Sequence, residues 1–187
     1  MRLELQDIED GPLKKELYCS PAEFPVLREM EKRHEARFYD PLVFQLRVQK
    51  SGQIVEIDGQ LTATVELFCG RCLQLYEQRI SGAFSLTFTP HPDAEEILDS
   101  HEGDEVELET DELGLVYYQD DFIELLHPLQ DQLVMALPIN PLCSEDCSGL
   151  CPKCGANLNH ETCDCAKEPF NNKFSALARI KFNSSEN

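Results

Sequence analysis

The amino-acid sequence predicts an α+β protein, built on a curved antiparallel β-meander or a partly open barrel with a few helices. Three observations lead to this class. Apolar and polar residues alternate over much of residues 42–89, a pattern typical of half-buried strands. Two other segments, within 24–38 and 127–137, have helical spacing instead. The last part of the chain is Cys-rich, with six cysteines in residues 143–165.

The length and composition fit one medium domain or a domain with a small appendage. The chain has 187 residues and 42% of them are hydrophobic, which allows a sizeable buried core. No run approaches the roughly eighteen apolar residues of a membrane span. The opening MRLELQDIEDGPLKKEL lacks the apolar stretch of a secretory signal. We therefore expect a cytoplasmic protein without a membrane partner.

The negative charge is concentrated in one segment. The net charge is −19, and no Lys or Arg occurs between Arg79 and Lys153. Within that gap, residues 91–121 are dense in Asp and Glu and are predicted to form an acidic loop. Such a field repels phosphate, so this part of the chain is not expected to carry bare nucleic acid. It either keeps the protein soluble or binds something basic.

Three regions are expected along the chain. Residues 1–40 form an N-terminal segment with a short helix, in which Phe24, Leu27 and Met30 make a narrow apolar stripe. A β-rich core follows over 41–141, with the acidic loop and a helix inside it. Residues 142–187 make up the Cys-rich segment and a terminal helix, NKFSALARIKF.

The core is expected to be a meander of about five strands. Residues 42–49 form one strand, and the turn SGQ leads to residues 54–68. There we expect two strands joined at Asp58-Gly59, because this dipeptide between alternating runs is a strong hairpin signal. Residues 76–89 give another strand pair or one long strand with a bulge near Gly82. The run EVELET adds a short strand on the acidic side.

A helix is expected at about residues 127–137. Pro128 suits a first helical position. Pro138 and Pro141 end the helix and lead into the Cys-rich segment. One face of the helix is apolar, formed by Leu129, Leu133, Val134 and Leu137.

The spacing of the last four cysteines is typical of a zinc knuckle. Cys151-Pro-Lys-Cys154-Gly155 has the ligand spacing of a tight turn that aims two sulfurs at one ion, with a Gly after the second Cys. Cys163 and Cys165 complete a C-x2-C-x8-C-x-C set. These four thiols are sufficient for one tetrahedral zinc site.

Two Cys pairs remain, and two partitions stay open. Cys69 and Cys72 follow a strand, and Cys143 and Cys147 follow the helix. Paired across the fold, they give a second four-Cys site, so that eight thiols hold two structural zinc ions and Cys19 stands apart. In the alternative, Cys69 and Cys72 share a single zinc with Cys151 and Cys154.

A catalytic use of the thiols is the alternative function: a zinc-dependent enzyme or a redox protein acting on RNA or protein. A redox C-x-x-C normally opens a helix in a βαβ unit, whereas Cys69 follows a strand in an antiparallel pattern. The order of His160-Glu161 and the cysteines does not match that of the zinc deaminases. Sites made only of Cys are closed and structural. We therefore expect no enzyme and assign no catalytic residue.

The order of the motifs resembles a known family. A strand ends in C-x-R-C-L (69–73), a helix runs into ALP-x-x-P-L-C (136–143), and C-x-G-L-C-P-x-C-G-x-N-L-N (147–159) follows with C-x-C behind it. This resembles the large ribosomal RNA subunit accumulation proteins, the YceD-like family. Where that family typically has Asp-Pro-Arg after the last Cys, this chain has Glu168-Pro169-Phe170.

The resemblance implies a non-enzymatic factor needed for synthesis, processing or stability of 23S ribosomal RNA. Its expected partner is large-subunit ribosomal RNA, a basic ribosomal protein, or both. The charge fits the basic protein better. The cationic residues that would contact RNA or a partner are Arg71, Arg79, Lys153, Lys167, Lys173, Arg179 and Lys181.

Overall fold

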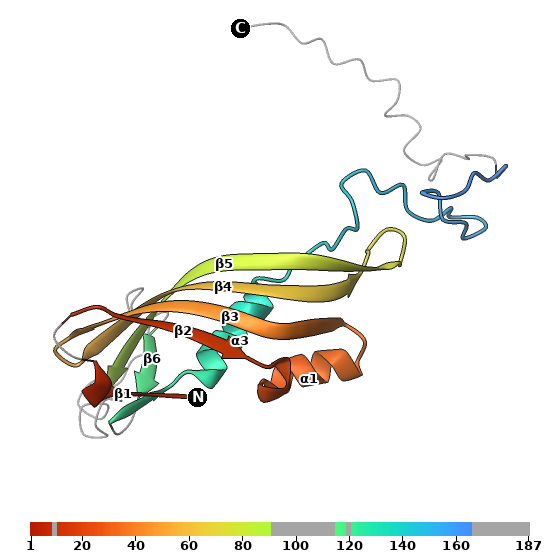
Figure 1. Cartoon of the computed structure of the whole chain (residues 1–187). Helices are drawn as coiled ribbons and strands as arrows, with labels where there is room; N and C mark the ends of the chain where they lie inside the picture. The colour runs from red at the N-terminus through yellow and green to blue at the C-terminus, as the bar shows by residue number, and fades with distance from the viewer. Residues whose placement is uncertain (9–10, 91–114, 119–120, 166–187) are drawn as a thin grey trace, which may run out of the picture.

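The computed structural model describes residues 1–8, 11–90, 115–118 and 121–165 (Figure 1). Its main feature is a five-stranded sheet in the order β2-β3-β4-β5-β6, accompanied by a two-stranded sheet of β1 and β7. The strands are β1 Arg2–Glu4, β2 Leu13–Cys19, β3 Ala36–Ser51, β4 Ile54–Phe68, β5 Leu75–Pro90, β6 Leu115–Tyr118 and β7 Phe122–Glu124. The helices are α1 Pro25–Lys32 and α3 Leu126–Met135, with short 3-10 turns at Leu5–Asp7 and Pro21–Glu23.

The predicted α+β class is confirmed, and the sheet is open rather than a closed barrel. Strands β2 to β5 pair antiparallel in sequence order, as a meander does. The last strand differs from the expected all-antiparallel pattern, because β6 pairs parallel to β5. A parallel pair needs a connection of about a dozen residues or more, and residues 91–114 lie between the two strands in the chain.

One face of the sheet is buried and the other is open. Burial alternates along β4 from residue to residue over the whole strand, so a single face carries the apolar side chains. In Figure 1, α3 crosses behind the three long strands, and α1 lies at the end near the β4–β5 hairpin. The core includes Phe44 and Phe88 from the sheet and Leu129 and Leu133 from α3. The opposite face is mostly polar.

The hairpin expected at Asp58-Gly59 is wrong. Strand β4 runs through both residues without a break, and Gly59 pairs with Phe84 of β5. A Cβ on Gly59 would clash with the Phe84 ring, so Gly59 leaves space for that ring instead of making a turn. The other expected turn, SGQ at 51–53, is confirmed: it joins β3 to β4, and Gly52 there has φ +62°.

Strand β5 is a single long strand, one of the two forms expected for residues 76–89. Its pairing with β4 continues through Gly82, opposite Leu61, with no bulge. The predicted helices are present as α1 and α3, although α1 ends at Lys32. Strands β1 and β2 were not expected. Part of the segment expected as an acidic loop, Leu115–Tyr118, is β6.

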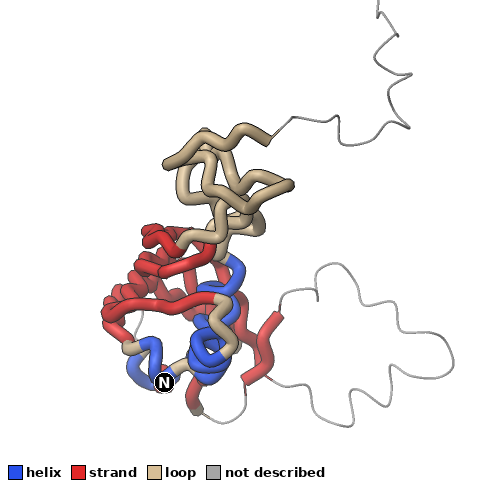
Figure 2. Tube along the Cα trace, turned by 90° about the vertical axis from the view of Figure 1, so that its right-hand side faces the viewer, coloured by secondary structure: helices blue, strands red, loops and turns tan. Residues whose placement is uncertain are grey.

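The rest of the expected acidic loop, with EVELET, lies almost wholly outside the described residues, as does the terminal helix. Among the helices that the structure describes, none has the length and apolarity needed to cross a bilayer. The Cys-rich segment forms irregular loops at one end of the large sheet (Figure 2). This places it beside the turn between β4 and β5, which carries the first Cys pair.

Candidate metal centre

The first thiol group joins two distant parts of the chain. Cys69 and Cys72 lie in the turn between β4 and β5, while Cys143 and Cys147 lie in the segment after α3. The four sulfur atoms are all within 4.8 Å of one another. The Cys69–Cys147 and Cys72–Cys143 sulfur distances are 3.7 and 3.6 Å. A disulfide would need about 2.05 Å, whereas a tetrahedron with Zn–S bonds of about 2.3 Å has edges of about 3.8 Å.

Backbone hydrogen bonds hold these two segments together. The Gly70 amide donates to the Pro141 carbonyl at 2.8 Å, so the turn is attached to the chain just before Cys143. Within the turn, the Cys69 amide donates to Gln74 and the Leu73 amide donates to Cys69, both at 2.9 Å. The thiols of the first pair are therefore aimed by a closed turn, as the C-x-x-C spacing predicts.

Arg71 contributes to this attachment through its side chain and its backbone. Its guanidinium donates to the carbonyl oxygens of Glu145 at 3.2 Å and Cys147 at 3.0 Å. Its own carbonyl accepts from the Leu150 amide at 3.2 Å. Gly149 has φ +73°, and a Cβ there would lie 3.2 Å from the Arg71 carbonyl oxygen. The sequence predicted Arg71 as an RNA or partner contact, and the structure places its side chain on the Cys-rich loop.

The second thiol group is local in sequence. The sulfurs of Cys151, Cys154, Cys163 and Cys165 also lie within 4.8 Å of one another. The knuckle turn is closed by the Gly155 amide, which donates to the Cys151 carbonyl at 2.9 Å. Gly155 has φ +75°, a conformation that favours glycine. The structure thus has two separate groups of four thiols. It does not have the alternative arrangement, in which Cys69 and Cys72 join Cys151 and Cys154.

Asn159 connects the two groups. Its side-chain Nδ2 lies 3.3 Å from the Cys147 sulfur and donates to it. Its Oδ1 accepts from the Ser148 amide at 2.7 Å. Such hydrogen bonds orient a ligand and stabilise its thiolate. Asn159 lies within the motif C-x-G-L-C-P-x-C-G-x-N-L-N, but its spacing alone predicted no role for it; its position shortly after the knuckle glycine was the available signal.

The pKa values show that neither group ionises fully by itself. Burial opposes ionisation of Cys69, but backbone amides of Cys143, Cys72 and Arg71 lower its pKa to about 6. Burial and the neighbouring thiols raise the pKa of Cys143 to about 12. Four thiolates at this spacing need a cation.

In the second group, too, one thiol has a lowered pKa and another has a raised pKa. Hydrogen bonds from the backbone of Cys154 and Lys153 help lower the pKa of Cys151 to about 6. Hydrogen bonding of the Cys165 thiol to Cys154, together with burial and the neighbouring Cys151, raises the pKa of Cys165 to about 12. A divalent metal ion that prefers sulfur would supply the missing charge in both places.

The remaining predicted contact residues are dispersed. Arg79 is exposed on the open face of β5, opposite Thr64. Lys153 is exposed in the knuckle turn. His160 is exposed as well, with Nε2 3.3 Å from the Gln74 side-chain oxygen, and it joins neither thiol group. The tail residues Lys167, Lys173, Arg179 and Lys181 lie outside the described residues.

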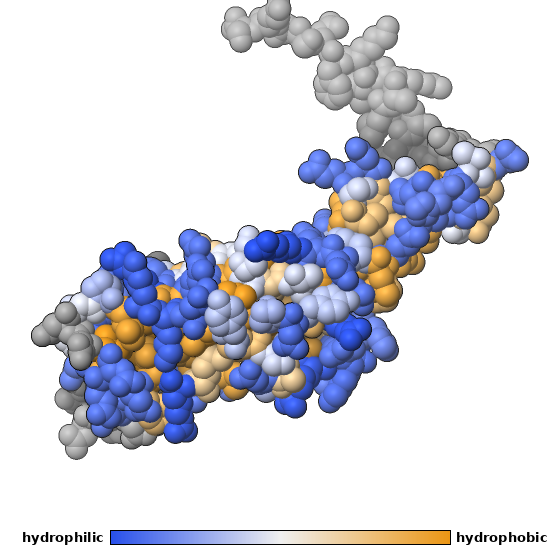
Figure 3. All heavy atoms as spheres, in the orientation of Figure 1, coloured by the Kyte–Doolittle hydropathy of each residue, from blue (hydrophilic) through white to orange (hydrophobic). Residues whose placement is uncertain are grey.

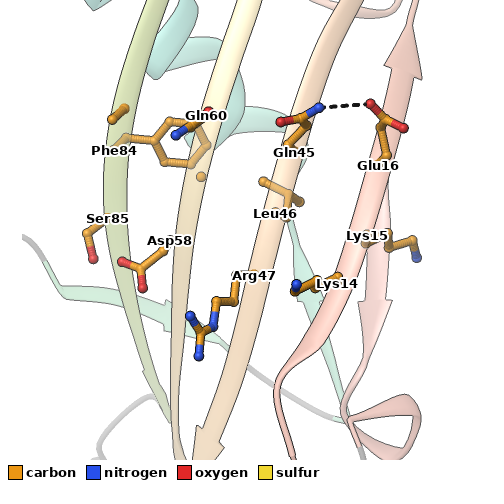
Figure 4. Close-up of a pocket in the computed structure, with 12 residues that line it drawn as sticks. Lys14, Lys15, Glu16, Gln45, Leu46, Arg47, Asp58, Gln60, Phe84 and Ser85 are labelled. Carbon is orange, nitrogen blue, oxygen red and sulfur yellow. Dashed lines mark hydrogen bonds between the residues drawn. The ribbon is translucent and has the colours of Figure 1, made fainter.

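A separate cavity crosses the large sheet. It is a shallow trough of about 860 Å³, and Figure 4 shows its lining side chains on strands β2 to β5. Its charged residues are mixed in sign: Lys14, Lys15 and Arg47 beside Glu16 and Asp58. The Glu16 carboxylate accepts from Gln45 at 3.1 Å. This near-neutral trough contains no thiol and lies apart from the Cys groups.

Comparison with known proteins gives the family. A family model described as "Large ribosomal RNA subunit accumulation protein YceD" matches residues 57–181. The matched region begins in β4 and contains all eight grouped thiols. The chain therefore belongs to the YceD family, as its motifs predicted. No solved structure matches it.

Several curated proteins are similar to it. An uncharacterized protein of Mycobacterium tuberculosis is 35% identical over 120 residues, which is 64% of this chain and 53% of the relative. The chloroplastic "Large ribosomal RNA subunit accumulation protein YCED homolog 1" of Arabidopsis thaliana is 25% identical over 75% of this chain and 49% of its own length. The Zea mays homologue of that name is 26% identical over 70% and 50%. The chain thus spans about half the length of these relatives.

Proposed function

We propose that this protein is a non-enzymatic factor required for accumulation of 23S ribosomal RNA, acting in biogenesis of the large ribosomal subunit. The observation that carries the proposal is the family match over residues 57–181, which includes both thiol groups. Two relatives are named for accumulation of large ribosomal RNA. The cytoplasm, where a bacterial ribosome is assembled, is the proposed location.

We further propose that each thiol group holds one structural Zn²⁺. Four sulfurs at tetrahedral-edge distances fit this ion, and the N–H donors of Arg71 and Asn159 to Cys69 and Cys147 fit thiolate ligands. Bound zinc offsets half of the charge of the four thiolates and cross-links the segments that carry them. Eight Cys ligands leave neither ion a position for water. This supports a structural role over the alternative of a zinc-dependent enzyme.

The direct partner in this proposal is large-subunit ribosomal RNA, a basic ribosomal protein, or both. With a net charge of −19, the chain repels phosphate at long range and attracts basic proteins. The Arg71 side chain is already hydrogen-bonded to the Cys-rich loop. Any RNA contact would therefore use the other predicted cations, which are Arg79, Lys153 and the four tail residues. No membrane partner is proposed.

The test has two arms. Depletion of the protein in its own cells should lower 23S relative to 16S ribosomal RNA, and an unchanged ratio would refute the proposal. A tagged pull-down, divided into samples with and without RNase, identifies the partner. If ribosomal RNA precursors are recovered and RNase removes every other component from the sample, the protein binds RNA directly. A ribosomal protein that remains after RNase treatment would show that the effect on RNA is indirect.

A further inference from the structure

We propose that the tip of the β4–β5 hairpin docks a short cationic segment of a partner protein through an apolar anchor. The surface, here called the apolar tip, consists of Phe68, Leu73 and Leu75. This inference rests on the proposed function, because it names the class of partner that the factor binds: a protein segment with both basic and large apolar side chains.

The three side chains are exposed together at one end of the sheet. Phe68 is 43% exposed, Leu73 61% and Leu75 53%. Phe68 and Leu75 are directly paired on neighbouring strands, so they share a face, and Leu73 lies in the turn between them. Figure 3 shows apolar atoms where the sheet meets the Cys-rich segment. Grouped apolar exposure of this kind marks interaction sites, unlike single scattered residues.

The backbone of Leu73 adds a second observation. Its φ is +60°, a left-handed conformation that is costly for a residue with a branched side chain and easy for Gly or Asn. Leu73 is therefore a poor choice for stability at this position, and its side chain is not buried in return. Strain of this kind is retained where the surrounding structure enforces it and function uses it.

The turn between β4 and β5 is held in one conformation, and this keeps the apolar tip exposed. Two hydrogen bonds close it, from Cys69 to Gln74 and from Leu73 to Cys69, and Cys69 and Cys72 belong to the first thiol group. A surface held in its binding geometry loses little conformational entropy when a partner docks.

A small acidic pocket beside the apolar tip indicates what the partner carries. Its volume is about 250 Å³, and Phe68 and Leu75 line it together with Glu31, Glu35 and Glu66. That volume is below the roughly 300–1,000 Å³ of small-molecule sites, so it suits a side chain of a larger partner.

The charge of this pocket favours a cationic protein segment over RNA. Its three carboxylates, with Glu29 beside them, face two guanidiniums. That of Arg37 pairs with Glu31 at 3.2 Å. That of Arg33 pairs with Glu29 at 3.1 Å and lies 4.0 Å from Glu35. The excess negative charge repels phosphate and attracts Arg or Lys. An apolar anchor on Phe68 and Leu75 with a basic residue at the pocket therefore satisfies both features of the surface.

The binding test uses a fluorescent synthetic peptide of alternating Arg and Leu with the zinc-loaded full chain. We expect Phe68→Ser and Leu73→Asn each to weaken binding at least about tenfold. Ile54→Ser, at an exposed apolar residue in the opposite hairpin, is the matched control and should leave it unchanged. An Arg/Ser peptide of equal charge should bind at least about tenfold more weakly. The proposal would be overturned if a Glu/Leu peptide bound the unaltered protein as tightly as the Arg/Leu peptide does. It would also be overturned if the Phe68→Ser and Leu73→Asn variants bound the Arg/Leu peptide as tightly as the unaltered protein does.

Leu73→Asn also separates binding from folding. Because Asn tolerates the left-handed conformation, this variant should unfold at an equal or higher urea concentration while binding is lost. A fall in stability would mean that Leu73 is structural and would overturn its assignment. Displacement of the peptide by fluorescent oligouridine would favour RNA as the occupant instead.

The 23S ribosomal RNA level separates this inference from the proposed function. If depletion leaves that level unchanged, the proposed function fails whatever the peptide does. If depletion lowers it and the Phe68→Ser protein restores it fully, the proposed function stands and the docking surface is refuted.

Discussion

The side-chain amide of Asn159 lies 3.3 Å from the sulfur of Cys147 and donates a hydrogen bond to it. Asn159 belongs to the loop enclosed by the second thiol group, whereas Cys147 belongs to the first. The two candidate metal sites are therefore adjacent in structure as well as in sequence. A change at Asn159 in the loop of the second group alters the hydrogen bonding of Cys147 in the first.

Asn159→Asp should weaken zinc binding at the first group. The carboxylate removes the N–H donor and places a negative charge beside a thiolate. A loss of about 10–100-fold in zinc affinity is expected, measured by competition with a chelator. Glu161→Gln, an exposed change in the same loop, is the control and should have no effect. Equal affinity in both variants would show that the hydrogen bond does not tune the site.

The zinc content should be about two ions per chain, measured by elemental analysis of the purified protein. Cys143→Ser and Cys163→Ser should each lower it to about one, because each removes a ligand from a different group. A ratio near one in the unaltered protein would contradict the two-site partition. If that single ion were unaffected by both substitutions, Cys69 and Cys72 would share it with Cys151 and Cys154.

Acid should release the zinc. The metal needs thiolates, and protons compete for them more strongly as the pH falls. Below the pKa of about 6 held by Cys69 and Cys151, even the most acidic thiol of each group is protonated in the metal-free chain. Zinc-dependent stability is therefore present at neutral pH and lost as the pH falls through this region. A zinc indicator dye can follow the release, and full retention at pH ~4 would contradict a thiolate site.

Arg71 should act through structure rather than through charge. Arg71→Lys keeps the cation but cannot donate in the same way to both Glu145 and Cys147, so we expect a loss of about 1–3 kcal/mol in the free energy of unfolding. Arg79→Lys, on the open face, is the control. The readouts are urea unfolding and zinc retention. If Arg71→Lys behaved as the unaltered protein in both, the two carbonyl contacts would not be the role of this residue.

Gly59→Ala should destabilise the sheet. The added Cβ would clash with the Phe84 ring, and overpacking of this kind costs about 1–3 kcal/mol. Gly82→Ala is the matched control, since its Cβ would find only ordinary contacts at 3.8 and 3.9 Å. Urea unfolding should separate the two variants, and Phe84→Leu should partly rescue Gly59→Ala. Equal stability of the two glycine variants would show that the sheet accommodates the extra methyl.

The thiol groups were the most predictable part of the molecule, because ligand spacing is a local property. The pairs Cys69/Cys72 and Cys151/Cys154 each lie in one turn, and that turn is readable from the sequence. Which pairs share an ion depends on the path of the chain between them, so the sequence left two partitions open. The contact of Asn159 with Cys147 depends on the same path.

The strand errors have a physical cause as well. Asp58-Gly59 has local turn chemistry, but tertiary packing against Phe84 decides the conformation. Strand β2 was missed because LKKELYC alternates poorly: three consecutive residues of this edge strand are exposed. The parallel β5–β6 pair follows a long connection, and no local pattern encodes how such a connection returns.

The two thiol groups differ in how far apart along the chain their members lie. Cys69 and Cys147 are 78 residues apart, so the first group forms only after the β4–β5 hairpin and the segment after α3 have come together. The second group closes within residues 151–165, and its loop-closure entropy is correspondingly small. If each group holds the proposed zinc ion, loading would be ordered: the local knuckle would bind its ion while the chain is still folding, and the distant group would bind its ion only after the tertiary structure has formed.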